Sequence, residues 1–172
     1  VDLINIPSLR LKQYLELSTV VAANETKWLN EICSSAINEA NKERGTLIIC
    51  ETIEHTKLIA DKLKSEYRAG AIKLYTMNNM NQEREIEKVN PGEIIIATNL
   101  AGRGTDIKTD EIEKNGGMHV IVTFMPSNQR VEEQAFGRTA RQGKRGTGQM
   151  ILNAVNLMEY GEFIPQAVKE LR

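Results

Sequence analysis

The chain has 172 residues, 41% of them hydrophobic and 26% charged, which is typical of a soluble globular domain. The formal net charge of −1 excludes a strong overall attraction to nucleic acid or to an anionic membrane, although a local basic patch stays open. No apolar run is long enough to span a bilayer. The two cysteines, Cys33 and Cys50, lack metal-ligand spacing and are expected to be reduced. A cytoplasmic location is therefore predicted.

Two helices are expected to begin at good capping residues. Asn24, followed by an acidic residue, predicts a helix that ends near Gly45, with Trp28 in the core. Thr52 predicts a second N-cap. The apolar face of that second helix is expected to contain the residues Leu58, Ile59 and Leu63.

Five apolar segments have the length and composition of buried strands and are expected at residues 47–50, 71–75, 93–98, 120–124 and 149–152. The run from Ile94 to Ala97 shows no alternation, as expected for a strand covered on both faces. Further helices are predicted at residues 82–89 and 130–141. This alternation of strands and helices predicts an α/β fold, with a parallel sheet between helices on both faces in three layers.

The expected organisation has one central domain. Residues 1–24 are interpreted as an extended connector, 25–155 as the domain and 156–172 as a C-terminal helical extension. The start at Val1 resembles no signal peptide and lacks an initiator methionine, so the chain is expected to be a piece of a larger protein. The charged stretch 109–114 is interpreted as a solvated face, or as an insertion that touches a partner.

The loop after the strand at 93–98 has the glycine-rich sequence TNLAGRGTD. Gly102 and Gly104 permit positive φ and let backbone N–H groups approach a ligand closely. Arg103 presents a cationic fork suited to phosphate or carboxylate. Asp106 can accept a hydrogen bond from a ribose hydroxyl or hold an arginine in place. Taken alone, the loop fits a tight turn with a solvated arginine equally well.

The predicted helix before the last strand carries the sequence QAFGRTARQG at residues 134–143. Arg138 and Arg141 are three residues apart and share one face of a helix. Two guanidinium groups on one face repel each other unless an anion lies between them, and a nucleotide γ-phosphate is such an anion. Taken alone, a basic surface turn leading into Lys144 is the simpler interpretation.

Together the two motifs resemble motifs V and VI of superfamily 2 helicase-type ATPases, in the form found in the SecA preprotein-translocase family. Members of that family carry T-N-x-A-G-R-G-T-D-I-K and G-R-x-x-R-Q-G, which residues 97–108 and 134–143 match closely. Residues 116–120 are similar to the family's G-G-L-H-V segment. The family often has an acidic residue and a proline after R-Q-G, where this chain has Lys144 and Arg145. The resemblance covers nearly the whole chain and implies a second RecA-like domain.

The resemblance also implies residue roles. Five residues are expected to bind the nucleotide or line the domain interface, namely Gly102, Arg103, Gly104, Asp106 and Gln134. Of these, Asp106 stands where the family contacts the nucleotide sugar. Arg138 and Arg141 stand where the family's arginines reach the terminal phosphates, and Arg141 is the preferred arginine finger.

The implied cofactor is ATP with Mg²⁺. The 172 residues contain neither a G-x-x-x-x-G-K-[ST] phosphate loop nor a D-E-x-[DH] box, and no metal-ligating residues are predicted. The resemblance implies that both motifs belong to a first RecA-like lobe, the expected partner, which would hold the Mg²⁺. The isolated chain is therefore expected to be inactive. A polypeptide substrate and a membrane translocon are the further partners of a SecA-type protein.

Two other functions stay open. One is the C-terminal lobe of an RNA or DNA helicase, although DEAD-box relatives read H-R-x-G-R in motif VI and this chain has Ala135, Phe136 and Gly137 before Arg138. Salt-sensitive binding to single-stranded nucleic acid would favour it. The other is a non-enzymatic interaction module that kept the fold and lost the motor.

Overall fold

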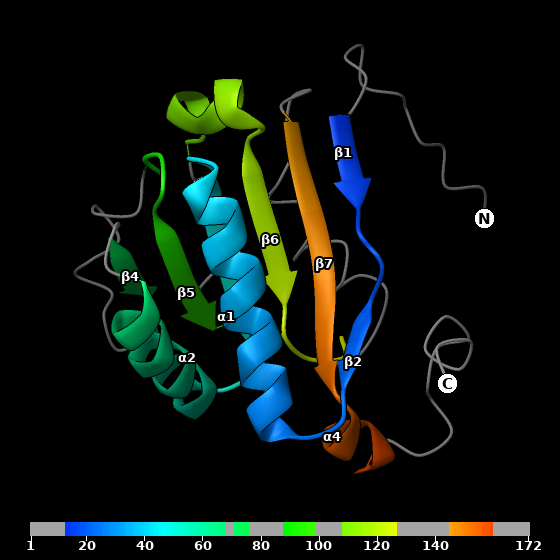
Figure 1. Ribbon diagram of the computed structural model, residues 1–172. Helices are drawn as coiled ribbons and strands as arrows, with labels where there is room; N and C mark the ends of the chain where they lie inside the picture. The colour runs from blue at the N-terminus through cyan, green and yellow to red at the C-terminus, as the bar shows by residue number, and fades with distance from the viewer. Residues whose placement is uncertain (1–12, 68–70, 76–87, 99–107, 127–144, 160–172) are drawn as a thin grey trace, which may run out of the picture.

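The computed structural model describes residues 13–67, 71–75, 88–98, 108–126 and 145–159. These residues form a seven-stranded sheet in which all the described pairings are parallel, with two long helices across one face (Figure 1). The strands are β1 (Gln13–Glu16), β2 (Val20–Ala22), β3 (Gly45–Cys50), β4 (Ile72–Tyr75), β5 (Ile94–Thr98), β6 (Met118–Val122) and β7 (Arg145–Asn153). The helices are α1 (Glu25–Asn41), α2 (Ile53–Glu66), the 3-10 helix η2 (Asp110–Asn115) and α4 (Ala154–Glu159). The predicted α/β class is confirmed.

The order of strands across the sheet is β1-β7-β6-β3-β5-β4, and β2 also pairs with β7. The chain therefore returns to the same edge of the sheet before each of the strands from β3 to β7 begins, as parallel pairing requires. The carboxyl ends of β3, β5 and β6 lie at one edge, and their amino ends lie at the other, beside η2 (Figure 1). We call these the carboxyl edge and the amino edge.

Both predicted N-caps are confirmed. The Asn24 side chain accepts a hydrogen bond from the N–H of Lys27 at 2.9 Å, and the Thr52 hydroxyl accepts one from the N–H of His55 at 3.1 Å. These oxygens satisfy backbone donors that have no partner within the first turn of a helix. Both helices, α1 and α2, start at the carboxyl edge and run antiparallel to the strands (Figure 1).

The core lies on both faces of the sheet. On one face, Trp28 and Ile32 of α1 and Ile59 of α2 are buried against Ile48, Ile96 and other residues of the strands. On the opposite face a second buried cluster includes Leu47 and Val120. Because β3, β5 and β6 contribute buried residues to both clusters, the continuous apolar runs of the sequence follow from burial on both faces.

The structure corrects four details of the predicted elements. Leu58 is 38% exposed, because the buried face of α2 consists of Thr56, Ile59, Ala60 and Leu63. β6 both begins and ends two residues earlier than predicted, and Thr123 and Phe124 lie beyond its end. Val89, predicted to end a helix, instead donates its N–H to the Lys108 carbonyl at 3.0 Å. Residues 110–114 of the charged stretch belong to η2, which ends at Asn115. Lys88 forms a parallel bridge with Lys108, and residues 82–87 and 130–141 of the two predicted helices lie outside the described residues.

The last strand differs most from its prediction. β7 has nine residues, Arg145–Asn153, where four were expected. Its first half pairs with β1 and β6, and its last residues pair with β2. The segment interpreted as a connector thus supplies two strands to the sheet.

Candidate functional site

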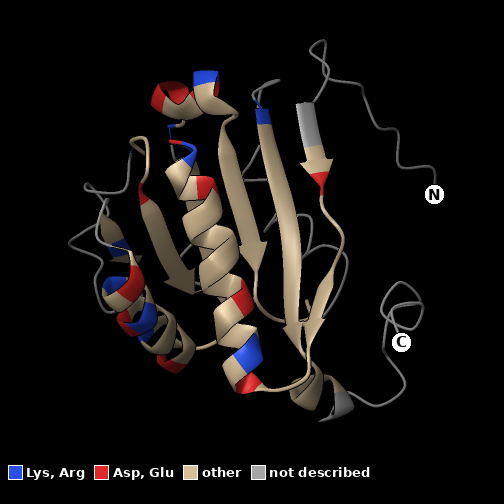
Figure 2. Ribbon diagram, viewed as in Figure 1, with Lys and Arg blue, Asp and Glu red and all other residues tan. Residues whose placement is uncertain are grey.

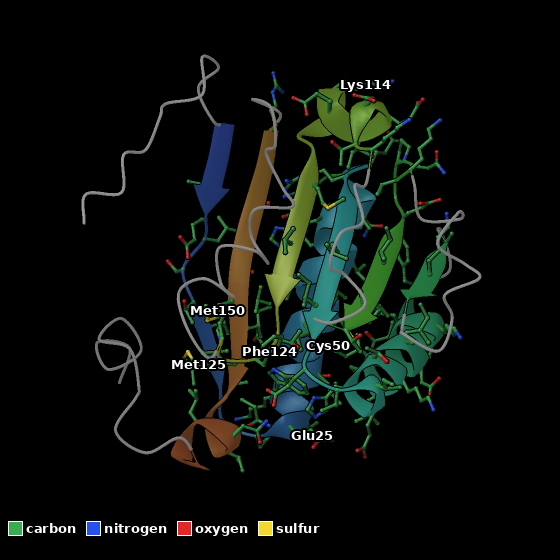
Figure 3. The ribbon with its side chains drawn as sticks, turned by 180° about the vertical axis from the view of Figure 1, so that it is seen from behind. Glu25, Cys50, Lys114, Phe124, Met125 and Met150 are labelled. Carbon is green, nitrogen blue, oxygen red and sulfur yellow. The ribbon has the colours of Figure 1, made fainter. Side chains whose placement is uncertain are left out.

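The carboxyl edge is the candidate nucleotide site, because ligands of open parallel sheets bind beyond the carboxyl ends of the strands. β5 ends there at the buried Thr98, directly before residues 99–107. β6 ends there as well, and the chain continues to Pro126, directly before residues 127–144. Figure 3 shows Cys50 and Phe124 near each other at this edge, with Lys114 of η2 at the opposite end of the molecule.

Hydrogen bonds beyond the strands fix the shape of this edge. Thr123 donates both its N–H, at 3.1 Å, and its hydroxyl, at 2.9 Å, to the carbonyl oxygen of Ile49. The backbone that leaves β6 is therefore tied to β3. Burial raises the pKa of the neighbouring Cys50 thiol to about 12, and that of Cys33 to about 12, so neither thiol is a nucleophile near neutral pH.

Two helix starts face the same edge. The indole N–H of Trp28 donates to the Ile151 carbonyl at 3.0 Å, which holds the first turns of α1 against β7. The Trp28 ring also packs edge-on against the His55 ring of α2, with ring centroids 5.0 Å apart. The partial positive charges of both helix N-termini are thereby fixed at the carboxyl edge, where they favour an anion.

All seven sequence-predicted site residues lie outside the described residues. They are Gly102, Arg103, Gly104, Asp106, Gln134, Arg138 and Arg141. The structure describes the residues on either side of them, and these show where the two motif segments begin and end. Residues 99–107 connect Thr98 at the carboxyl edge with Lys108, and residues 127–144 connect Pro126 with Arg145 at the amino edge. The roles of the seven residues stay predictions.

The amino edge carries a buried polar cluster that sequence reasoning missed. The Arg44 guanidinium pairs with the Glu39 carboxylate and donates to the Thr147 hydroxyl at 2.8 Å. Burial works to raise the pKa of Glu39, but the hydrogen bond and the charge of Arg44 outweigh it, so the pKa lies below its ordinary value. The ion pair joins α1, the start of β3 and β7.

His119 lies at the centre of this cluster and is fully buried. Its Nδ1 is 2.6 Å from the Thr147 hydroxyl and its Nε2 is 3.1 Å from the Ser35 hydroxyl, which donates to Gln149. Because Thr147 accepts from Arg44, its own hydrogen can go to Nδ1, and a neutral imidazole then donates from Nε2. Burial lowers the pKa of His119 to about 4, in agreement with this neutral form.

Charged side chains are concentrated away from the strands. Figure 2 shows charged residues along α2, on η2 and on α1, and few on the strands. Within the described ranges, no group of His, Cys, Asp or Glu residues has the arrangement of a metal site. No helix in the same part of the chain is long and apolar enough to cross a membrane.

Residues 26–143 match the family model of the helicase conserved C-terminal domain. The chain belongs to this family. The helicase C-terminal domain is 32% identical over 156 residues to "Protein translocase subunit SecA 2" of Rhodopirellula baltica, an alignment that covers 87% of the chain and 23% of the relative. It is 34% identical over 150 residues to "Protein translocase subunit SecA" of Clostridium novyi, with 84% and 18% covered. The similarity to SecA expected from the two motifs is thus confirmed over most of the chain.

Among solved structures, the domain resembles S. cerevisiae Dbp5 bound to RNA and ADP BeF3, with a TM-score of 0.62 and 18% identity. The alignment covers 91% of this chain and 41% of Dbp5. At this identity the likeness shows the fold, which is that of a helicase C-terminal lobe. The domain spans less than a quarter of the length of the two SecA relatives.

Sequence reasoning found the chemical motifs of the helicase C-terminal domain and overlooked its buried cluster. Arg44, Glu39 and Thr147 are each unremarkable in the sequence, because only the parallel crossovers bring them together. One signal was present. The family-like segment 116–120 contains His119 and the two glycines whose carbonyls accept hydrogen bonds from Arg44.

Proposed function

We propose that this chain is the second motor lobe of a SecA-type ATPase. It completes an ATP site at the interface with a first RecA-like lobe, and hydrolysis there drives a polypeptide across a membrane. The observation that carries the proposal is the 32–34% identity with SecA proteins of two bacteria. Alignments that cover 84–87% of the chain necessarily include both motif segments, 99–107 and 127–144.

The proposed division of labour follows the motifs. In this proposal Asp106 contacts the ribose, and Gly102, Arg103, Gly104 and Gln134 line the interface. Arg138 and Arg141 act on the terminal phosphates, where positive charge stabilises the transition state of phosphoryl transfer. The first lobe supplies the phosphate loop and the Mg²⁺ ligands. The described frame supports this arrangement, since the two helix starts at the carboxyl edge favour an anion.

A helicase lobe is the second candidate. The observation that favours it is the likeness to Dbp5, whose solved structure contains RNA. The sequence of motif VI argues against it, because Gln134 and Ala135 stand where DEAD-box proteins have the H-R pair. The net charge of −1 also gives no general attraction to phosphate backbones.

The experiment compares the 172-residue chain with a longer protein in which the chain follows a phosphate-loop lobe. We expect negligible ATP hydrolysis by the chain alone and steady turnover by the longer protein, measured as phosphate release. Robust turnover by the chain alone would contradict the proposal. So would an inactive longer protein.

The moving polymer is identified with two stimulation assays on the longer protein. A SecA-type motor is expected to hydrolyse ATP faster when an unfolded preprotein and translocon-containing vesicles are added. A helicase is expected to respond to single-stranded RNA, with binding that weakens steeply between 50 and 200 mM salt, roughly as its phosphate contacts dictate. Stimulation by RNA alone would replace the first candidate by the second.

A further inference from the structure

The segment from Asp110 to Gly117, η2 and the glycine turn after it, adjoins the downstream ends of both motif segments. Lys108 directly follows residues 99–107, and its carbonyl accepts the Val89 N–H at 3.0 Å. Thr109 then leads into η2 and is buried. Lys108, the residue directly after the first motif segment, is therefore held at the amino edge.

The residue directly after the second motif segment, Arg145, is held by the same element. Arg145 directly follows residues 127–144, and its N–H donates to both carboxylate oxygens of Glu113, at 2.9 and 3.1 Å. Gly117 lies against the carbonyl of Arg145 so closely that a Cβ on it would stand 1.9 Å from that oxygen. The first residue of β7 is thus held by hydrogen bonds at its N–H and by a close contact with Gly117 at its carbonyl.

The element itself is anchored to the core. The Arg44 guanidinium donates to the carbonyls of Gly116, Gly117 and Met118, at 3.1, 3.4 and 3.3 Å. Ile112, in the middle of η2, is fully buried. A short helix with a buried apolar residue, followed directly by three anchored carbonyls, is a rigid base for the groups that it contacts.

We propose that residues 110–117 position the nucleotide site. In this proposal Glu113 fixes Arg145 at the start of β7, and Arg145 directly follows the second motif segment, residues 127–144, which contains Arg138 and Arg141. This inference rests on the proposed function, because it assigns the device to the same ATP site. Glu113 is a positioning residue, since it acts through the backbone of Arg145. The charged stretch 109–114, interpreted from the sequence as a solvated face or as an insertion that touches a partner, thereby receives a role.

The size of the effect follows from chain length. Arg141 lies four residues before Arg145, so covalent geometry keeps their Cα atoms within about 14 Å of each other. A misplacement of about 1 Å at a reacting group costs up to about a hundredfold in rate. The Glu113 carboxylate secures only one end of the segment, so a smaller loss is expected.

The test is the Glu113→Ala variant in the longer protein that carries the phosphate-loop lobe. We expect kcat for ATP hydrolysis to fall by about threefold to tenfold while KM for ATP stays within about twofold, because an arginine finger acts mainly on the transition state. Glu113→Gln is expected to restore most of the rate, since its amide oxygen still accepts the Arg145 N–H. Rescue by the conservative variant separates positioning from a general loss of structure.

Glu111→Ala is the matched control. It removes the same charge from the same helix. Among the described residues Glu111 forms an exposed ion pair with Lys88, with both side chains more than half exposed. Its kcat should equal that of the wild type. Equal kcat values for Glu113→Ala and Glu111→Ala would overturn the inference, as would a Glu113→Ala loss that Gln does not rescue. An inactive wild type would instead overturn the proposed function.

Discussion

The two edges of the sheet are built in different ways. The carboxyl edge presents helix N-termini and the points from which two motif segments leave. Between its described elements, the side-chain hydrogen bonds include those of Trp28 and Thr123. The amino edge contains a buried ion pair, a buried neutral histidine and a glycine turn pressed against β7. One edge is arranged to meet a ligand and a second lobe, and the other holds the strands in register. Substitutions at the first edge should therefore change rate. Those at the second should mainly change stability, except at Glu113, which contacts the start of β7 and is proposed to affect rate.

The largest effect is expected for Arg141→Ala in the longer protein. If Arg141 is the arginine finger, kcat should fall by about a thousandfold or more, with little change in KM for ATP. The free energy of unfolding of the 172-residue variant should stay within about 0.5 kcal/mol of the wild type. Steady-state phosphate release and urea denaturation provide the two measurements.

Lys144→Ala is the control, because it removes one positive charge from the same segment outside the predicted motif contacts. Its kcat should be close to that of the wild type. An unchanged kcat in Arg141→Ala would remove this residue from the mechanism and leave Arg138 as the remaining candidate.

The contrast between the edges also explains what the sequence could predict. Local signals were sufficient for the N-caps Asn24 and Thr52 and for the strand Ile94–Thr98, because capping and continuous apolar runs depend on neighbours in the chain. The first half of β7, with Gly146 and Gly148, has no apolar run. Its strand conformation depends on pairing with β1 and β6, far away in sequence.

The predicted site divides in the same way. The motif wording assigned chemistry to residues such as Asp106 and Arg141, because glycine-rich loops and paired arginines have recognisable ligands. It could not show Glu113 beside the Arg145 N–H, since a carboxylate in a charged stretch usually faces solvent. That contact depends on how η2 and β7 meet in three dimensions.

Gly117→Ala should produce the largest stability loss at the amino edge. Gly117 has a φ of +77°, and an added Cβ would stand 1.9 Å from the Arg145 carbonyl oxygen, so the backbone must move. We expect the free energy of unfolding to fall by about 2 kcal/mol or more.

Gly116→Ala is the comparison. Its φ of +107° is also strained, but the nearest atom is a side-chain nitrogen of Arg44 at 3.2 Å, so its loss should be smaller. Equal losses in urea denaturation would contradict the tight contact with β7.

The smallest effect is a dependence of stability on pH that comes from His119. Its pKa is about 4 in the folded chain and 6.5 when exposed, so between these values the unfolded state binds a proton that the folded state does not. Stability should therefore be complete above about pH 6.5 and fall as the pH decreases, by up to about 1.4 kcal/mol per pH unit. The pKa of Glu39 also affects stability, but only below its ordinary value of 4.5, so a window of pH 5 to 6.5 isolates the histidine.

His119→Gln should lower stability and flatten this slope. His55→Gln, which removes the other histidine of the chain, should leave the slope intact. If His55→Gln flattened the pH dependence instead, the buried neutral imidazole of His119 would not be its source. His119 would then no longer distinguish the amino edge from the carboxyl edge.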